Sequence, residues 1–190
     1  MTTLAAIQGP SWVVVGYDSM VTDEGRTYTL PKDAGKCVKN GDYLLAVAGD
    51  FRVVNILSHS FSPPAVVDGR GVDLDKFMIS KFVPALKRCF DTNFYGKDGQ
   101  QDSLVLVVVN GVAYEIGGNY DCIRDQHGLY ALGSGADFAL GALYALDSAR
   151  EGRRSMASAR EHMQFAMQAA VSLDSGTAEP VIITTERWRE

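Results

Sequence analysis

The first 25 residues, MTTLAAIQGPSWVVVGYDSMVTDEG (1–25), place a threonine directly behind the first methionine and ahead of two apolar stretches. The stretches Thr3–Gln8 and Trp12–Tyr17 are rich in residues that favour β-strands. Gly9-Pro10 between them is typical of a turn. The chain is therefore expected to begin with two strands, the first of them starting immediately after Thr2.

The rest of the chain continues with alternating groups of strands and helices. Asn40-Gly41 and Asn110-Gly111 each separate two apolar runs and predict tight hairpins. Further strands are expected at Lys36–Lys39, Tyr43–Ala48, Ser103–Asn110, Val112–Ile116, Gly128–Leu132 and Val181–Thr185. Helices are expected at Asp50–Phe61, from about Asp73 with a kink at Pro84, at Ala136–Arg150, and along a stripe of Met156, Ala159, Met163, Ala166, Met167 and Ala170.

This order of elements predicts the fold class. Strands, helices, strands, helices and a last strand follow one another in separate groups, which favours an antiparallel α+β layer fold over an alternating parallel one. The apolar runs are nearly continuous, so both sheets should be largely buried. A length of 190 residues without a low-complexity linker predicts one domain over residues 1–190.

Composition excludes several classes of function. A net charge of −5 and an isoelectric point near 5.2 argue against a nucleic-acid partner. The longest apolar run, at 104–109, is too short to cross a membrane, and no signal peptide is recognisable. Three widely spaced cysteines fit a reducing compartment, so a cytoplasmic location is expected. Neither these cysteines nor His59, His127 and His162 have metal-binding spacing, so no metal is expected.

Thr2 has a chemical interpretation beyond that of an ordinary strand residue. Methionine is normally removed when the second residue is small, which would leave Thr2 with a free α-amine. That amine has a reference pKa of about 7.7–8.0 and can serve as the base for the threonine hydroxyl. Met-Thr-Thr alone is a weak signal, and the alternative is that Thr2 has no catalytic role.

Two further segments could support such a nucleophile. Asp18 ends the second strand and Lys36 begins a later one, so the two could form a buried pair beside Thr2 and lower the pKa of its amine. Ala48-Gly49-Asp50 stands between a strand and a helix, where the Gly49 N–H could stabilise an oxyanion. The alternatives are a turn aspartate, an exposed lysine and a simple connection.

Other glycine-rich segments do not indicate a cofactor. Gly133-Ser134-Gly135 also joins a strand to a helix, but it matches neither a nucleophile elbow nor a phosphate-binding loop. The chain contains no nucleotide-binding motif, so no cofactor is expected.

Taken in order, these segments resemble proteasome β-type subunits and the bacterial peptidase HslV. The matching features are Thr2-Thr3, the strand that ends in Gly-x-Asp-Ser, Thr22 and Gly25, the segment 43–49 and the segment 129–135. Each feature is weak, but together they span nearly the whole chain. The resemblance implies the four-layer αββα sandwich of the N-terminal nucleophile hydrolases.

The resemblance also implies roles for individual residues. Thr2 would be the nucleophile and its α-amine the base, with Asp18, Lys36 and Ser134 in the supporting network. The Gly49 N–H would form the oxyanion hole. Thr22 would hold the substrate backbone as an added strand. Val47 would line the pocket for the side chain before the scissile bond, which suggests a preference for apolar side chains.

Two details depart from the family pattern. The segment after Asp18 is slightly longer than usual, so Lys36 fits the strand register better but Lys32 remains an alternative. The family pattern Asp-x-x-Ser-Gly appears here as Ser172-Leu-Asp-Ser-Gly176, with Ser172 in place of the aspartate. Asp174 could substitute for it beside Ser175, or the network could be altered.

The expected function is that of a threonine peptidase subunit in a self-compartmentalising ring of stacked, identical subunits. The substrate would be a peptide or an unfolded protein, and ATP use would belong to a separate unfoldase. The alternatives are an N-terminal nucleophile amidase that acts on a small amide, a non-catalytic shell or assembly subunit, and an α+β binding module without catalysis.

Overall fold

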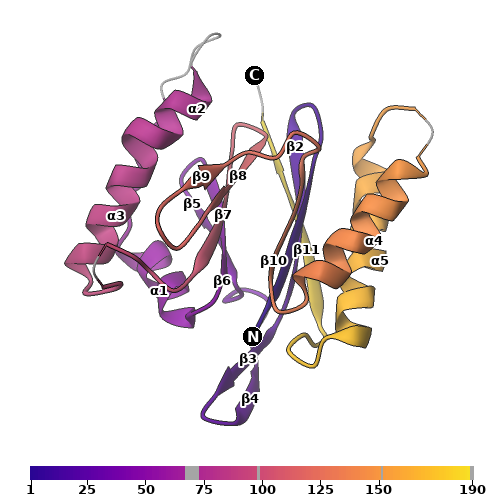
Figure 1. Ribbon diagram of the computed structural model, residues 1–190, viewed down its shortest axis with the longest axis horizontal. Helices are drawn as coiled ribbons and strands as arrows, with labels where there is room; N and C mark the ends of the chain where they lie inside the picture. Colours follow the sequence, from indigo (N-terminus) through magenta and orange to yellow (C-terminus); the bar gives the residue numbers. More distant parts are fainter. Residues whose placement is uncertain (67–72, 98, 151, 189–190) are drawn as a thin grey trace.

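The computed structural model describes residues 1–66, 73–97, 99–150 and 152–188. Two antiparallel sheets occupy the middle of this part of the molecule (Figure 1). The four-stranded sheet has the order β10-β1-β2-β11, and each neighbouring pair is antiparallel. Its strands are β1 (Thr3–Gln8), β2 (Trp12–Asp18), β10 (Leu129–Gly133) and β11 (Val181–Arg187).

The second sheet has five strands in the order β5-β6-β7-β8-β9, again with antiparallel neighbours. Asn110 and Gly111, between β7 and β8, have φ values of 50° and 71°, the left-handed conformation that a tight hairpin turn requires. The expected hairpin at Asn110-Gly111 is therefore confirmed. The strands are β5 (Cys37–Asn40), β6 (Tyr43–Ala48), β7 (Leu104–Val109), β8 (Val112–Ile116) and β9 (Cys122–Ile123).

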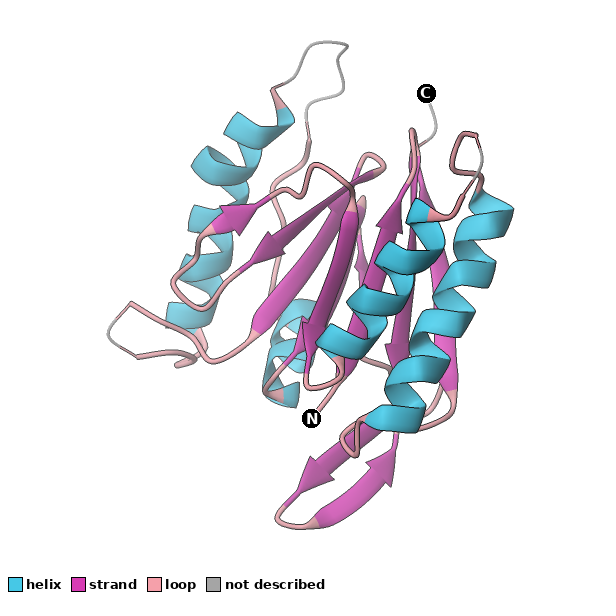
Figure 2. Ribbon diagram, turned by 45° about the vertical axis from the view of Figure 1, so that its right-hand side comes forward, coloured by secondary structure: helices cyan, strands magenta, loops and turns pink. Residues whose placement is uncertain are grey.

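Helices lie on the outer face of each sheet, and the two sheets face each other (Figure 2). The helices α1, α2 and α3 lie beside the five-stranded sheet, whereas α4 and α5 lie beside the four-stranded sheet (Figure 1). The expected antiparallel α+β fold is confirmed. The helices are α1 (Phe51–His59), α2 (Leu74–Phe77), α3 (Val83–Thr92), α4 (Ala136–Ser148) and α5 (Met156–Leu173).

Three clusters of buried apolar side chains hold these layers together. The cluster between the sheets includes Leu4, Val15 and Leu106. A second cluster joins the five-stranded sheet to α1 and α3, and a third joins the four-stranded sheet to α4 and α5. The methionine stripe of α5 contributes Met163 and Met167 to the third cluster. Burial of apolar surface on both faces explains the uninterrupted apolar strands.

The long helix expected from Asp73 is interrupted before Pro84. A π-helical segment, η1 (Met78–Phe82), connects α2 to α3. Proline has no backbone N–H and cannot complete the regular hydrogen-bond pattern of the preceding turn, and π-helical turns accommodate such interruptions. The apolar face continues through it, with Met78, Phe82 and Leu86 fully buried.

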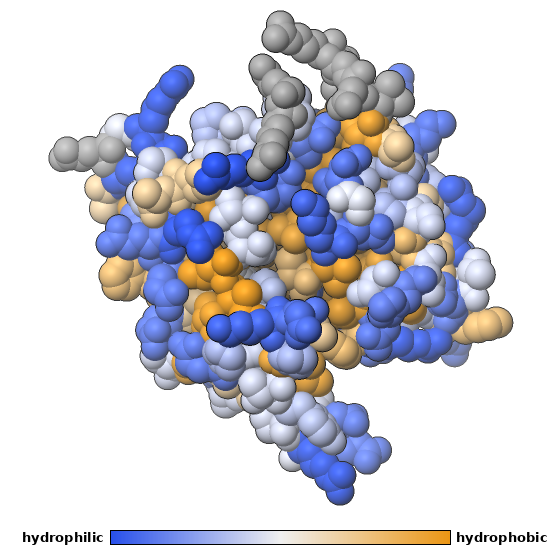
Figure 3. All heavy atoms as spheres, turned by 180° about the vertical axis from the view of Figure 1, so that it is seen from behind, coloured by the Kyte–Doolittle hydropathy of each residue, from blue (hydrophilic) through white to orange (hydrophobic). Residues whose placement is uncertain are grey.

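A third, two-stranded sheet was not expected from the sequence. The strands β3 (Met20–Asp23) and β4 (Arg26–Thr29) form a hairpin around Glu24 and Gly25, which both have positive φ. The hairpin projects from the body of the molecule, with hydrophilic side chains at its tip (Figures 1 and 3). β4 is exposed along its whole length, so no apolar alternation marked it as a strand.

Candidate active site

Thr2 lies at the entry to β1 and is almost completely buried, with 4% of its surface exposed. Its backbone N–H points to Ser134 Oγ at 3.4 Å, and its hydroxyl donates to the carbonyl oxygen of Met1 at 2.6 Å. Met1 is present, so the Thr2 nitrogen is a peptide amide here. The Thr2 hydroxyl and the Thr2 nitrogen, which the sequence suggested as nucleophile and base, thus contact Met1 and Ser134 respectively.

Asp18 and Lys36 form a buried ion pair next to Thr2. Lys36 Nζ lies 2.7 Å from Asp18 Oδ1, with the side chains 2% and 0% exposed. Asp18 ends β2, the neighbour of β1, so it also accepts hydrogen bonds from the backbone N–H groups of Thr3 (2.9 Å) and Met20 (3.0 Å). The ammonium group of Lys36 reaches the Met1 carbonyl oxygen at 3.4 Å. A fixed positive charge thus lies beside the carbonyl group that precedes Thr2.

Two opposing effects act on Lys36. Burial lowers the pKa of its ammonium group, while the charge and hydrogen bond of Asp18 raise it, and the pKa remains below its ordinary value. Lys32 is exposed, so Lys36 is the lysine that the fold brings to this site. Lys36 was expected to begin a strand, but β5 starts at Cys37, and Lys36 still accepts a hydrogen bond from Val47 N–H.

A second polar chain approaches Thr2 from the end of α5. Ser134 Oγ donates to Asp174 Oδ2 at 2.8 Å, and the Thr177 hydroxyl donates to the same oxygen at 2.6 Å. Thr177 in turn shares a short hydrogen bond with the Thr3 hydroxyl. Burial raises the pKa of Asp174, but the hydrogen bonds from Thr177, Ser134 and Gly176 and the nearby N-terminal charge outweigh it, and the pKa is lowered.

Among the three supporting residues suggested at the end of α5, the fold therefore brings Asp174 to Ser134. Ser172 and Ser175 are exposed. The Asp174 carboxylate also accepts the backbone N–H of Gly176 at 3.1 Å, which holds the turn after the helix in place. The shifted position of the carboxylate, two residues beyond the family pattern, is accommodated by this turn.

A cleft of about 480 Å³ opens beside Thr2. Thr22 from the β3–β4 hairpin, Val47 from β6 and Gly49 from the loop before α1 all line it. Gly49 has a φ of 130°, a conformation open essentially to glycine. The complete lining consists of Met1, Thr2, Val21, Thr22, Asp23, Tyr28, Leu30, Lys36, Val47, Gly49, Asp50, Phe51 and Val54.

Several residues of this site were missed by sequence reasoning. Thr3 and Thr177 join the hydrogen-bond chain to Asp174, and Tyr28 and Leu30 form part of the cleft. Thr177 directly follows Ser175-Gly176, so that segment was a usable signal. Nothing local marked Tyr28, because its position depends on where the projecting hairpin folds.

Neither a metal site nor a membrane-spanning helix is found in the described part of the chain. No group of three or more His, Cys, Asp or Glu side chains there is arranged to hold a metal ion. None of the helices in those residues combines the length and the apolar character needed to cross a membrane.

Comparison with known proteins identifies solved structures with a similar fold. No protein-family model matches this sequence, and no curated protein matches it. Thiobacillus denitrificans BPH, a bacterial proteasome homologue solved in complex with epoxomicin, superposes with a TM-score of 0.77 at 18% identity over 100% of both chains. BPH solved alone gives a TM-score of 0.77 and 18% identity over 99% of both chains. Eukaryotic HslV from Trypanosoma brucei gives 0.65 and 20% identity, over 98% of this chain and 99% of its own.

These similarities extend over essentially the whole chain. The chain therefore has the α+β fold of proteasome-like β-type peptidases. The resemblance that the sequence motifs indicated is confirmed at the level of the fold.

Proposed function

We propose that this protein is a threonine-type peptidase subunit of a proteasome-like ring, with Thr2 as its N-terminal nucleophile after removal of Met1. One observation carries the proposal. Thr2, Lys36 and Gly49 come from separate parts of the chain and line one cleft. Lys36 is paired there with the buried Asp18, and Ser134, which is bonded to Asp174, contacts the Thr2 nitrogen. Buried polar groups rarely converge in this way without a function.

In the proposed reaction, loss of Met1 turns the Thr2 nitrogen into a free α-amine. The positive charge of Lys36 disfavours protonation of that amine and so lowers its pKa from the reference of about 7.7–8.0. The neutral amine accepts the hydroxyl proton while Thr2 Oγ1 attacks the carbonyl carbon of the scissile peptide bond. The amine then passes the proton to the leaving nitrogen as the peptide bond breaks, leaving an ester on Thr2.

Water completes the proposed cycle. The α-amine removes a proton from water, whose oxygen attacks the ester carbonyl carbon. The bond from that carbon to Thr2 Oγ1 then breaks, and the amine returns the proton to Oγ1 as the product acid leaves. In both steps negative charge develops on the carbonyl oxygen, and the Gly49 N–H is the proposed donor to it. The Ser134 hydroxyl, oriented by Asp174, holds the Thr2 nitrogen in position.

The cleft supports an extended peptide as the substrate. Thr22 and Gly49 lie on its walls, so a peptide could add as a strand and bind through main-chain hydrogen bonds. Val47 lines the same cleft and supports a preference for apolar side chains before the scissile bond. Peptide or unfolded protein is therefore the proposed substrate.

Assembly into stacked rings of identical subunits is part of the proposal. Exposed apolar side chains on the outer helices supply a surface for such contacts, including Phe138 and Tyr144 on α4 and Phe165 and Leu173 on α5. We further propose that residues 1–190 form one domain, that its layers are the αββα sandwich of N-terminal nucleophile hydrolases, and that a separate ATPase unfolds substrates. A cytoplasmic location stays a prediction.

Intact-mass spectrometry with and without epoxomicin tests the proposal first. Epoxomicin is an epoxyketone, and such reagents close a ring with both the hydroxyl and the free amine of an N-terminal threonine. The expected result is a mass without Met1 that increases by one inhibitor, together with hydrolysis of extended peptides.

The other outcomes separate the rivals. A mature chain that stays unlabelled and inactive would support a shell or assembly subunit, whereas activity on small amides alone would support the amidase. A preparation that retains Met1 is first treated with a methionine aminopeptidase and then measured again.

A further inference from the structure

Ser103 lies directly behind the Gly49 loop. It precedes β7, is 2% exposed, and its hydroxyl oxygen accepts the backbone N–H of Asp50 at 3.0 Å. The approach to Gly49 itself is also close, because a Cβ atom on Gly49 would lie 2.7 Å from Ser103 Oγ and 2.9 Å from the Asp102 carbonyl oxygen. Ser103 therefore holds the peptide that follows Gly49.

Ser103 is itself held by two buried side chains. Tyr95, 6% exposed, forms a hydrogen bond with the Ser103 hydroxyl at 2.8 Å. The Gln101 side chain, 3% exposed, accepts Ser103 N–H at 2.7 Å and donates to the Gly117 carbonyl oxygen at 3.1 Å. The Tyr95 ring packs edge-on against Phe90 with its centroid 5.1 Å away. The hydroxyl behind the loop thus has a rigid support.

Gly49 needs such support because glycine does not restrict its own backbone. The peptide before Gly49 is held by the β6–β7 pairing, where Ala48 is opposite Leu104. The peptide after Gly49 is held by Ser103, and Asp50 then caps α1 through the N–H of Arg52 at 2.8 Å. With both peptides held, the φ of 130° at Gly49 and the direction of its N–H are determined.

We infer that Ser103, supported by Tyr95 and Gln101, is a positioning residue that aims the Gly49 N–H at the carbonyl oxygen of the reacting substrate. The inference rests on the proposed function, in which that N–H stabilises the oxyanion. Ser103 acts through the Gly49-Asp50 peptide rather than on the substrate. Its contribution should consequently appear in the transition state and not in substrate binding.

The variant Ser103→Ala removes the hydroxyl and leaves the Asp50 N–H without its acceptor. We expect kcat for a peptide substrate to fall about tenfold with KM changed less than about twofold, since loosening an oxyanion donor costs less than the roughly 100-fold of removing one. The control Ser58→Ala deletes a hydroxyl that bonds only within α1, to the Val54 carbonyl oxygen, and should leave both constants unchanged.

A pair of inhibitors supplies a readout that a merely structural role would not move. A peptide aldehyde binds by adding Thr2 Oγ1 to its carbonyl carbon while the carbonyl oxygen takes the proton, and that oxygen occupies the oxyanion position. The same peptide ending in an amide binds without this bond. Ser103→Ala should weaken aldehyde binding by about the same tenfold as kcat and leave amide binding unchanged.

Each other outcome is decisive. The inference would be overturned if Ser103→Ala changed neither kcat nor aldehyde binding, or if it weakened aldehyde and amide binding equally. Either result would leave the proposed function intact. If Ser103→Ala does not fold, Tyr95→Phe is measured in its place. The expected result is a fall of about twofold to threefold in both kcat and aldehyde affinity. Wild-type values for both quantities in Tyr95→Phe would overturn the inference. A mature wild-type protein that neither cleaves peptides nor binds the aldehyde would instead contradict the proposed function itself.

Discussion

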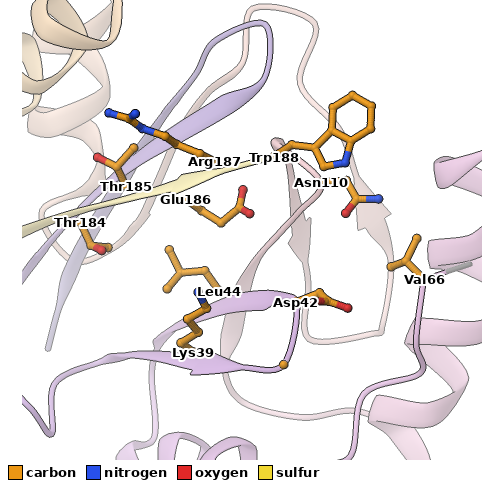
Figure 4. A pocket seen from close by; sticks show the side chains of 11 residues that line it. Lys39, Asp42, Leu44, Val66, Asn110, Thr184, Thr185, Glu186, Arg187 and Trp188 are labelled. Atoms are coloured by element: carbon orange, nitrogen blue, oxygen red, sulfur yellow. The ribbon is translucent and has the colours of Figure 1, made fainter. Parts of the chain in front are cut away.

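Two hollows of this molecule differ in size and in chemistry. The larger, about 740 Å³, lies beside the β5–β6 and β7–β8 turns and the end of β11 (Figure 4). The smaller, about 480 Å³, lies at the other end of the same sheets, where β1 begins. In the larger hollow the charged groups of Lys39, Asp42 and Arg187 are exposed.

The lining of the smaller hollow instead includes Lys36, which is almost fully buried and is paired at 2.7 Å with the buried Asp18. Burying charges is costly unless they are paired, so such an arrangement persists only where the surrounding fold enforces it. The proposed active site is thus not at the larger of the two hollows. It is instead where buried, hydrogen-bonded polar groups converge, and the predictions below test that difference.

The largest effect is expected from Thr2→Ala, which removes the proposed nucleophile. Peptide hydrolysis should fall at least about 10³-fold in kcat, because no other group in the cleft replaces the hydroxyl. Thr2→Ser keeps a hydroxyl and should retain measurable turnover. The measurement is steady-state kinetics on a fluorogenic peptide with the mature protein. Full activity of Thr2→Ala would place the chemistry elsewhere and break the contrast between the hollows.

The next effect concerns stability. Lys36→Met leaves the buried Asp18 carboxylate without its counter-charge and should lower the free energy of unfolding by about 3–5 kcal/mol. The matched control is Lys39→Met in the larger hollow. Lys39 is exposed, so its replacement should change stability by less than about 0.5 kcal/mol. Equal effects of the two variants in chemical denaturation would show that the ion pair is not special.

A smaller effect is expected in substrate choice. Val47 lines the cleft and is 2% exposed, so peptides with an apolar side chain before the scissile bond should be cleaved about tenfold faster than those with a charged one. A panel of peptides that differ only at that position measures kcat/KM for each. Preference for acidic or basic side chains would contradict the role proposed for Val47.

The smallest effects are pH-dependent and have opposite signs at Asp174, which is bonded to Ser134, and at Glu186, which lines the larger hollow. Asp174 has a lowered pKa, so its ionised form stabilises the fold above its ordinary pKa near 3.8, and this stabilisation is lost as pH falls through the lowered value. Asp174→Asn should therefore cost about 1 kcal/mol at pH 7, a hydrogen-bond value reduced for partial exposure, and the deficit should disappear in acid.

Burial raises the pKa of Glu186 above its ordinary value of 4.5. The folded state then binds a proton more readily than the unfolded state, so ionisation of Glu186 destabilises the fold as pH rises through the raised pKa. Glu186→Gln should be more stable than the wild type at pH 7, by less than about 1 kcal/mol, and lose this advantage as pH falls. Denaturation from pH 7 down to about pH 2 measures both variants across the range in which each carboxyl takes up its proton. The contrast would be contradicted if both substitutions changed stability at pH 7 in the same direction.

The sequence was sufficient for most elements because their signals are local. The apolar runs of β1, β2, β6, β7 and β8, the Asn110-Gly111 turn and the stripe on α5 all match the structure closely. The β3–β4 hairpin was missed because its stability does not come from an apolar face. The two-residue strand β9 was missed because it is too short to show a period.

The residues of the candidate site were harder to predict from the sequence than the helices and strands. Thr2, Asp18 and Gly49 could be singled out because each stands next to the end of a strand. The choice of Lys36 over Lys32, and of Asp174 over Ser172 and Ser175, depends on which side chains the fold buries. Ser103 and Tyr95 carried no local signal at all.

The sequence by itself determined the order of strands and helices, because hydrophobic periodicity and turn residues act over a few neighbouring positions. It also determined which residue types were available for chemistry. Only the tertiary structure decided which of them meet. Thr2 and Ser134 are 132 positions apart, and Asp18 and Lys36 are 18 apart. Thr2 meets Ser134 because β1 pairs with β10 within one sheet, and Asp18 meets Lys36 because the two sheets bury their apolar faces against each other.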